Sequence, residues 1–111
     1  MAKVEVESHQ GRNLLFGEIS VSAGTTQLVA APSTSYHRIK VVSYVVVATA
    51  AGTAKFSDGS DLSGAMAFAA NGGVSAAGQA SSPWFACDAG AALSIVTTAA
   101  MEGHLSYVVE P

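Results

Sequence analysis

The segment that most constrains the fold is residues 36–50, YHRIKVVSYVVVATA, the longest strand-like run in the chain. Valine and isoleucine are β-branched, and such side chains fit a pleated strand better than a helix. The segment has more residues than one flat strand usually needs, so we expect a bend or bulge near Ser43. The sequence therefore predicts a β-sheet built around this segment.

Further strand signals follow along the chain, whereas the Ala-rich tracts carry no 3.6-residue apolar stripe. Residues 3–8 alternate polar and apolar side chains, as a half-buried strand does. Residues 14–22 place Leu15, Ile19 and Val21 on one face and Phe16, Glu18, Ser20 and Ser22 on the other. The remaining expected strands are residues 27–31, 54–57, 65–70, 84–87, 92–98 and 104–110.

Turn signals separate these segments about every 8–15 residues, which is typical of a sandwich, a jelly roll or a small barrel. We predict an all-β fold, a jelly-roll-like β-sandwich of about eight short antiparallel strands. One domain should span residues 1–111, with residues 1–12 as an N-terminal arm or an edge strand. The predicted core residues are Ile39, Val41, Val45, Val47, Phe56, Trp84, Leu93, Ile95, Leu105 and Tyr107.

Composition excludes several classes of partner. Only 12% of residues are charged and the net charge is −3, so no basic stripe exists to bind nucleic acid. The longest apolar run, residues 41–51, is interrupted by Ser43 and Thr49 and is too short to cross a membrane. The first twelve residues do not resemble a signal peptide. The single cysteine excludes an internal disulfide and fits synthesis in a cytoplasm.

Two loops invite a functional reading. Asn71-Gly72-Gly73 could cradle a phosphate, but no lysine or helix pattern follows it, and Asn-Gly readily forms a turn between strands. The loop at residues 57–64 contains Asp58 and Asp61 and could bind calcium. It lacks the alternating carboxylates and the distal glutamate of a calcium loop, so a hairpin connection is the favoured interpretation.

Several single side chains also have both a functional and a structural interpretation. His9, His37 and His104 have no ligand-spaced partners, and we expect them on strands or at strand ends. Cys87 could be a nucleophile, but nothing local activates it, and a core position is favoured. The aromatic residues Trp84, Phe85, Phe68 and Phe56 are expected in the core rather than on a ligand-stacking surface. We therefore predict no catalytic residues, no metal site and no cofactor, and the chain is not expected to be an enzyme.

Residues 28–109 resemble small bacteriophage virion proteins. The resemblance rests on the valine-rich strand, followed in order by DLSGA, ANGG, the Trp-Phe pair, AGAALSIVTT and GHLSYVV. Length and style are similar to the head decoration (cement or staple) proteins of epsilon15-type short-tailed phages. Phage tail and fibre modules share the pattern and remain the alternative.

The resemblance implies a jelly roll on the outer surface of a capsid that clamps neighbouring major capsid protein subunits and stabilises the head. It also implies contact with further copies of the chain, as a dimer or trimer. Lys3–Ser8 and His104–Glu110 are the predicted pairing edges, because terminal strands often lie at sheet edges. The capsid contacts are expected from Met1–Arg12 and from a small-residue loop, Gly73–Ser82.

Overall fold

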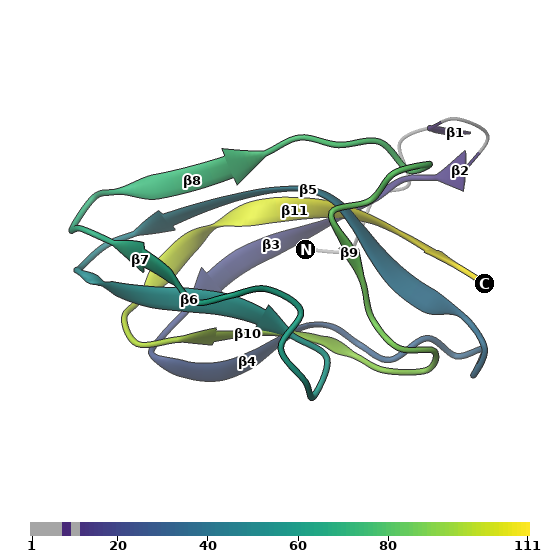
Figure 1. The fold of residues 1–111 in the computed structure, drawn as a ribbon, viewed down its shortest axis with the longest axis horizontal. Coiled ribbons are helices and arrows are strands. Elements are labelled where there is room, and N and C mark those ends of the chain that lie inside the picture. The colour runs from purple at the N-terminus through teal and green to yellow at the C-terminus, as the bar shows by residue number, and fades with distance from the viewer. Residues whose placement is uncertain (1–7, 10–11) are drawn as a thin grey trace.

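The structure is a computed structural model that describes residues 8–9 and 12–111, and within these it contains strands and no helix. Figure 1 shows the strands wrapped around a common interior. The strands are β1 (Ser8–His9), β2 (Arg12–Asn13), β3 (Leu15–Val21), β4 (Gly24–Val29), β5 (Arg38–Ala48), β6 (Gly52–Ser57), β7 (Met66–Phe68), β8 (Gly73–Ala76), β9 (Phe85–Ala86), β10 (Leu93–Thr97) and β11 (Met101–Glu110).

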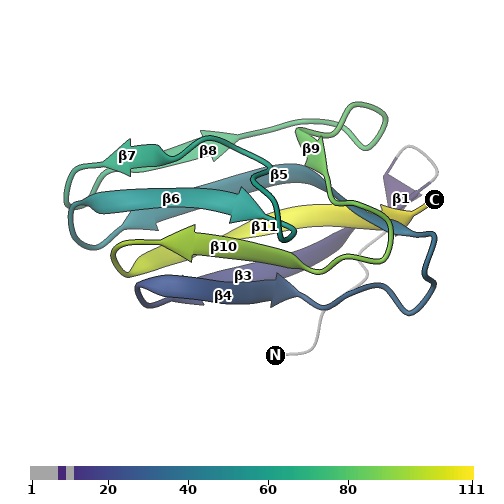
Figure 2. The same cartoon turned by 60° about the horizontal axis from the view of Figure 1, so that its bottom comes forward.

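Two antiparallel sheets face each other, as Figure 2 shows from a second direction. One sheet has the order β3-β11-β5-β8, with β9 also paired to β5, and the other has the order β4-β10-β6-β7. Among the described strands, the short β1 and β2 pair with each other and with no other strand. The predicted all-β sandwich is therefore confirmed.

The pairing is that of a jelly roll. The first long strand pairs with the last (β3 with β11), β4 pairs with β10, β5 with β8, and β6 with β7. These four pairs form one long antiparallel ribbon. Rolling the ribbon up adds the contacts of β11 with β5 and of β10 with β6, which complete the two sheets.

This topology overturns one predicted edge. Strand β11, which contains His104–Glu110, lies between β3 and β5, because the ribbon brings the end of the chain against its beginning. The sheet edges are instead β3 and β8 in one sheet and β4 and β7 in the other. Of the other predicted edge, Lys3–Ser8, only Ser8 lies within the described residues.

A bulge in β5 decides which valines enter the core. The register against β11 shifts between Ser106, which is opposite Ser43, and Tyr107, which is opposite Val41. Val42 is therefore the extra residue, and the bulge expected near Ser43 is confirmed. Because side chains alternate along a strand, one extra residue exchanges the two faces of everything beyond it.

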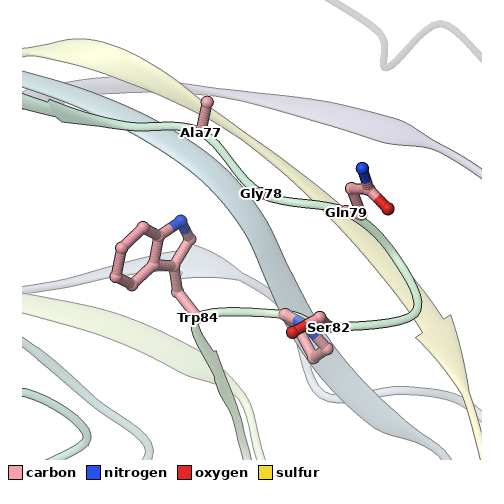
Figure 3. A pocket seen from close by; sticks show the side chains of 6 residues that line it. Ala77, Gly78, Gln79, Ser82 and Trp84 are labelled. Atoms are coloured by element: carbon pink, nitrogen blue, oxygen red, sulfur yellow. The ribbon is translucent and has the colours of Figure 1, made fainter.

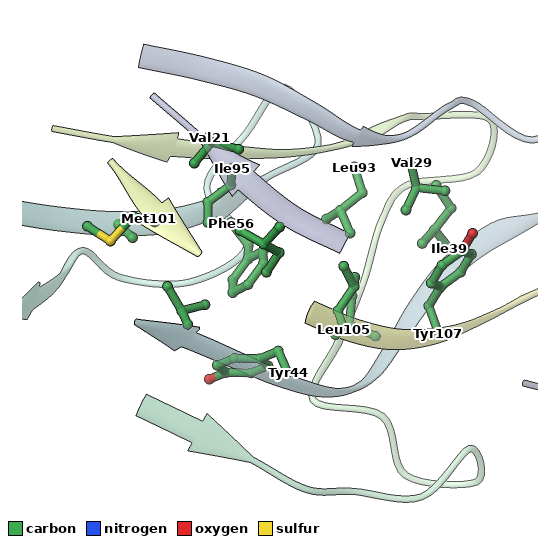
Figure 4. Close-up of a cluster of buried hydrophobic side chains, with 14 of the residues drawn as sticks. Val21, Val29, Ile39, Tyr44, Phe56, Leu93, Ile95, Met101, Leu105 and Tyr107 are labelled. Atoms are coloured by element: carbon green, nitrogen blue, oxygen red, sulfur yellow. The ribbon is translucent and has the colours of Figure 1, made fainter. Parts of the chain in front are cut away.

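The exchange corrects two core predictions. Val46 is fully buried, whereas Val47 is 40% exposed and Val45 is half-buried, since both lie on the outer face beyond the bulge. Trp84 was also predicted in the core and is 54% exposed. Figure 4 shows side chains of the main core meeting between the sheets. The predicted residues that are buried there are Ile39, Val41, Phe56, Leu93, Ile95, Leu105 and Tyr107.

A second, smaller cluster of buried residues contains Val42, Val108 and Ala80, with Leu14 packed against it. Val42 is the bulge residue, and Ala80 belongs to the connection between β8 and β9. The bulge thus supplies an apolar side chain to which this connection is anchored.

Candidate functional site

The Asn-Gly-Gly segment forms the turn between β7 and β8. Asn71 has a φ of 64°, a conformation that asparagine tolerates, and the amide of Gly72 donates to the carbonyl oxygen of Ala69 at 2.9 Å. A Cβ on Gly73 would lie 2.7 Å from the carbonyl oxygen of Val46, so this glycine allows β8 to approach β5. The turn interpretation is confirmed.

The carboxylates of the loop after β6 bind the loop's own backbone, a neighbouring connection and β6. Asp58 accepts hydrogen bonds from the amides of Ser60, at 3.1 Å, and Asp88, at 2.7 Å. Asp61 forms an ion pair with Lys55 at 2.9 Å. Because the loop joins β6 to β7, which pair antiparallel, the hairpin-loop interpretation is confirmed. Within the described residues, no three His, Cys, Asp or Glu side chains lie close enough to hold a metal ion.

Cys87 is a core residue, as predicted, with no exposed surface. Burial, together with the nearby negative charges of Asp58 and Asp88, raises the pKa of its thiol from 9.0 to about 12. Because the thiolate is the reactive form, this thiol is held in its unreactive state. The histidines lie where they were expected: His9 in β1, His37 next to the start of β5, and His104 in β11.

The Trp-Phe pair points in two directions. Phe85 packs with Tyr44 and Phe56, at ring-centroid distances of 6.1 and 5.1 Å. Trp84 faces outward because adjacent residues in an extended segment project to opposite sides. The expectation of a core aromatic therefore holds for Phe85 and is wrong for Trp84.

The connection that carries Trp84 is held at several points. The predicted loop Gly73–Ser82 begins later than expected, because its first four residues form β8. Beyond β8, Ala80 is buried in the smaller cluster, and the amide of Ser82 donates to the carbonyl oxygen of Gln79 at 2.9 Å. The amide of Trp84 donates to the carbonyl oxygen of Val41, also at 2.9 Å. This loop, residues 77–84, is called the Trp84 loop below.

A shallow pocket of about 400 Å³ opens in the Trp84 loop. Figure 3 shows the indole of Trp84 on one side and Gly78 across from it. A Cβ on Gly78 would lie 3.1 Å from Nε1 of Trp84 and 2.7 Å from the carbonyl oxygen of Val42, so the glycine lets the indole lie close to the loop. The pocket is lined by Ala77, Gly78, Gln79, Ser82, Pro83 and Trp84.

Exposed apolar side chains occur in two regions of the described surface. Phe16 and Val47, 39% and 40% exposed, lie on the outer face of the sheet that contains β3 and β5. Tyr36 and Trp84, 64% and 54% exposed, lie in connections near the first half of β5. The sequence predicted Tyr36 as the first residue of the strand-like segment 36–50, whereas β5 begins at Arg38 and leaves Tyr36 in the connection before it.

The predicted contact segment Met1–Arg12 falls mostly outside the described residues. Of it, Ser8–His9 and Arg12 belong to the β1–β2 pair, whose register joins Ser8 with Asn13 and His9 with Arg12. In the described ranges, no helix is long and apolar enough to cross a membrane.

No protein-family model and no curated protein matches the sequence. Among solved structures, one similar chain is from a structure of infectious bursal disease virus, Gx strain. It has a TM-score of 0.47 and 11% identity, and the alignment covers 95% of this chain and 34% of that one. The protein therefore spans about a third of the length of the virus chain.

A second similar structure is a chain of Bacillus endospore appendages, described as a novel family of disulfide-linked pili. Its TM-score is 0.43 with 12% identity, and the alignment covers 97% of this chain and 96% of that one. At such TM-scores and identities, neither structure carries a function over to this protein.

Proposed function

We propose that this chain is a structural virion protein that binds the outside of a phage capsid and clamps neighbouring major capsid protein subunits. The sequence resemblance over residues 28–109 supports the class of protein, and the jelly-roll topology agrees with what that resemblance implies. The proposal assigns the chain no catalytic step, metal or cofactor. Its place is the capsid surface, after synthesis in the host cytoplasm.

The observation that carries the proposal is the exposed ring of Tyr36 in the connection that precedes β5. Tyr36 is 64% exposed, the largest fraction among the exposed large hydrophobic residues of the described part of the chain. A protein partner that covers this connection gains from burying the ring. A standard interface buries about 800 Å² on each partner, and several such contacts on one capsid act together.

Self-association is part of the proposal. With β11 excluded as an edge, the candidate strand is β3, whose seven residues contain neither lysine nor proline to discourage pairing. Antiparallel pairing of two β3 strands would join two sheets across a dimer. Sedimentation of the purified protein tests this, and a species that stays monomeric at every concentration, with copies isolated on the particle, would contradict it.

Binding to particles that lack the protein tests the clamp. Purified chain is mixed with such particles, the particles are pelleted, and the bound fraction is measured against concentration. We expect saturable binding to the head that weakens when Tyr36 is changed to Ser. Thr98→Ser, at another exposed polar position between β10 and β11, is the matched surface control and should bind like the wild type.

Deletion of residues 1–12 tests whether the N-terminal segment contributes to capsid binding. A folded, truncated chain that no longer binds would identify the segment as a clamp, and unchanged affinity would exclude it. Binding only to tails or fibres would refute the capsid assignment in favour of a tail or fibre module.

A further inference from the structure

We infer that the Trp84 pocket binds neutral carbohydrate, with one pyranose ring stacked on the indole of Trp84. Nothing in the clamp proposal requires this site, and the inference holds wherever the protein is located. It rests on three properties of the pocket: a positioned aromatic face, a lining without charge, and a concave, open shape.

The aromatic face is positioned before any ligand arrives. The backbone of Trp84 is bonded to Val41 in the middle of a sheet, and the indole lies against Gly78, where no Cβ intervenes. Burial of Ala80 fixes the opposite part of the loop. Yet Trp84 is 54% exposed, so a large flat ring is left open to solvent on a loop that is anchored at Ala80 and at the backbone of Trp84. A ligand that stacks on it pays little for ordering the site.

The lining suits a neutral sugar. A pyranose ring has a face of C–H groups, which carry slight positive charge and are attracted to the negative face of an indole. Its rim carries hydroxyl groups, which exchange hydrogen bonds with amide and hydroxyl side chains such as those of Gln79 and Ser82. None of the six lining residues is charged. A phosphate, a sulfate or an acidic sugar would therefore lose hydration without gaining an ion pair.

The shape favours a sugar over a protein anchor. A tryptophan that anchors a protein interface usually projects into a pocket of the partner. Trp84 instead forms a wall of a concave site, so it receives a ring (Figure 3). A volume of about 400 Å³ lies within the range of small-ligand sites. Because the pocket is shallow, we expect the chain of an oligosaccharide to extend beyond it.

The test uses an advantage of the sequence, which contains a single tryptophan. Indole fluorescence therefore reports on this pocket alone. The protein is titrated with neutral hexasaccharides of glucose, mannose, galactose and N-acetylglucosamine, and with a hexasaccharide of galacturonic acid. We expect at least one neutral hexasaccharide to shift the emission to shorter wavelength, with a dissociation constant of about 10 µM to 1 mM. The acidic probe should bind at least tenfold more weakly.

Variants locate the binding by calorimetry, which needs no tryptophan. Trp84→Ala should weaken binding at least tenfold, and Gly78→Ala should weaken it because its new Cβ displaces the indole or the loop. Phe16→Ala removes an exposed aromatic ring from the outer face of a sheet and should leave affinity unchanged. The thermal unfolding of each variant is measured alongside, so that a loss of fold is not counted as a loss of binding.

The inference is overturned if none of the neutral hexasaccharides binds, if Trp84→Ala binds as the wild type does, or if only the acidic probe binds. It is also overturned if Trp84→Ala abolishes binding to particles while no sugar binds, because the ring would then be a protein anchor. If the clamp proposal fails, the result is different: the protein does not bind particles but still binds a neutral sugar.

Discussion

Two adjacent valines in β5 provide a direct test of the bulge. Val46 is fully buried and Val47 is 40% exposed, although both pair with β11 on one side and with β8 on the other. A strand that continued the alternation of Ile39 and Val41 without a bulge would bury Val47 instead. We therefore compare Val46→Ala with Val47→Ala.

The expected difference follows from burial. Replacing Val46 with alanine removes two buried carbons, worth about 0.8 kcal/mol each in transfer free energy, and the cavity left behind adds about 1 kcal/mol. We expect a total loss of about 2–3 kcal/mol. Val47→Ala loses the same β-branched preference but little burial, so we expect about 0.5–1 kcal/mol. In a domain of this size the midpoints should fall by about 10 °C for Val46→Ala and about 3 °C for Val47→Ala.

Urea unfolding, followed by circular dichroism, measures both free energies. The slope of each transition should match that of the wild type, which shows that the native and unfolded states expose similar surface in all three proteins. Equal losses for the two variants, or a larger loss for Val47→Ala, would refute the bulge at Val42 and the core assignment that depends on it.

Three further predictions concern the stability and reactivity of the same fold. Gly103 has a φ of +154°, and an added Cβ would overlap the carbonyl oxygen of Val45. Gly103→Ala should therefore lower the free energy of unfolding, measured by urea titration, by more than about 3 kcal/mol. The control Gly64→Ala, whose added Cβ meets open space, should change the free energy of unfolding by less than about 1 kcal/mol. Asp58→Ala should lower the free energy of unfolding by about 1–2 kcal/mol, because the amides of Ser60 and Asp88 lose their acceptor. An unchanged unfolding midpoint would show that water replaces the carboxylate. Burial raises the pKa of the Cys87 thiol from 9.0 to about 12, so a thiol reagent at pH 8 should modify the unfolded but not the native protein. The stability that the protonated thiol contributes is present below pH 9 and is lost as the pH rises towards 12. Cys87→Ala should therefore lose less stability than the wild type over this pH range. An identical dependence of stability on pH in the two proteins would contradict this prediction.

The local pattern of the sequence was sufficient for most of the strands and for the place of the bulge, because alternation and turn residues act over a few positions. It was wrong for β8, which was predicted as part of a loop. Residues 14–22 have the two faces that their alternation predicts, with Ile19 and Val21 buried. The alternation of Ile39 and Val41, continued along β5, predicts that Val45 and Val47 lie in the core. One extra residue, Val42, reverses that assignment.

The pairing of distant strands was beyond reach from local pattern. β11 is an inner strand because it pairs with β3, some 80 residues earlier in the chain. The local sequence of neither strand indicates which strand it pairs with. The exposure of Trp84 has a similar origin. A Trp-Phe pair in an extended segment must divide between two faces, but only the packing of Phe85 against Tyr44 and Phe56 decides which ring enters the core.

The central claim, a clamp on the outside of a capsid, is tested most directly by imaging purified virus particles by cryo-electron microscopy and fitting this jelly roll into the density. We predict several hundred copies spread over the head, each in contact with neighbouring major capsid protein subunits and with another copy of itself. A few copies at a single vertex, or density for the chain only in the tail or fibres, would contradict the account.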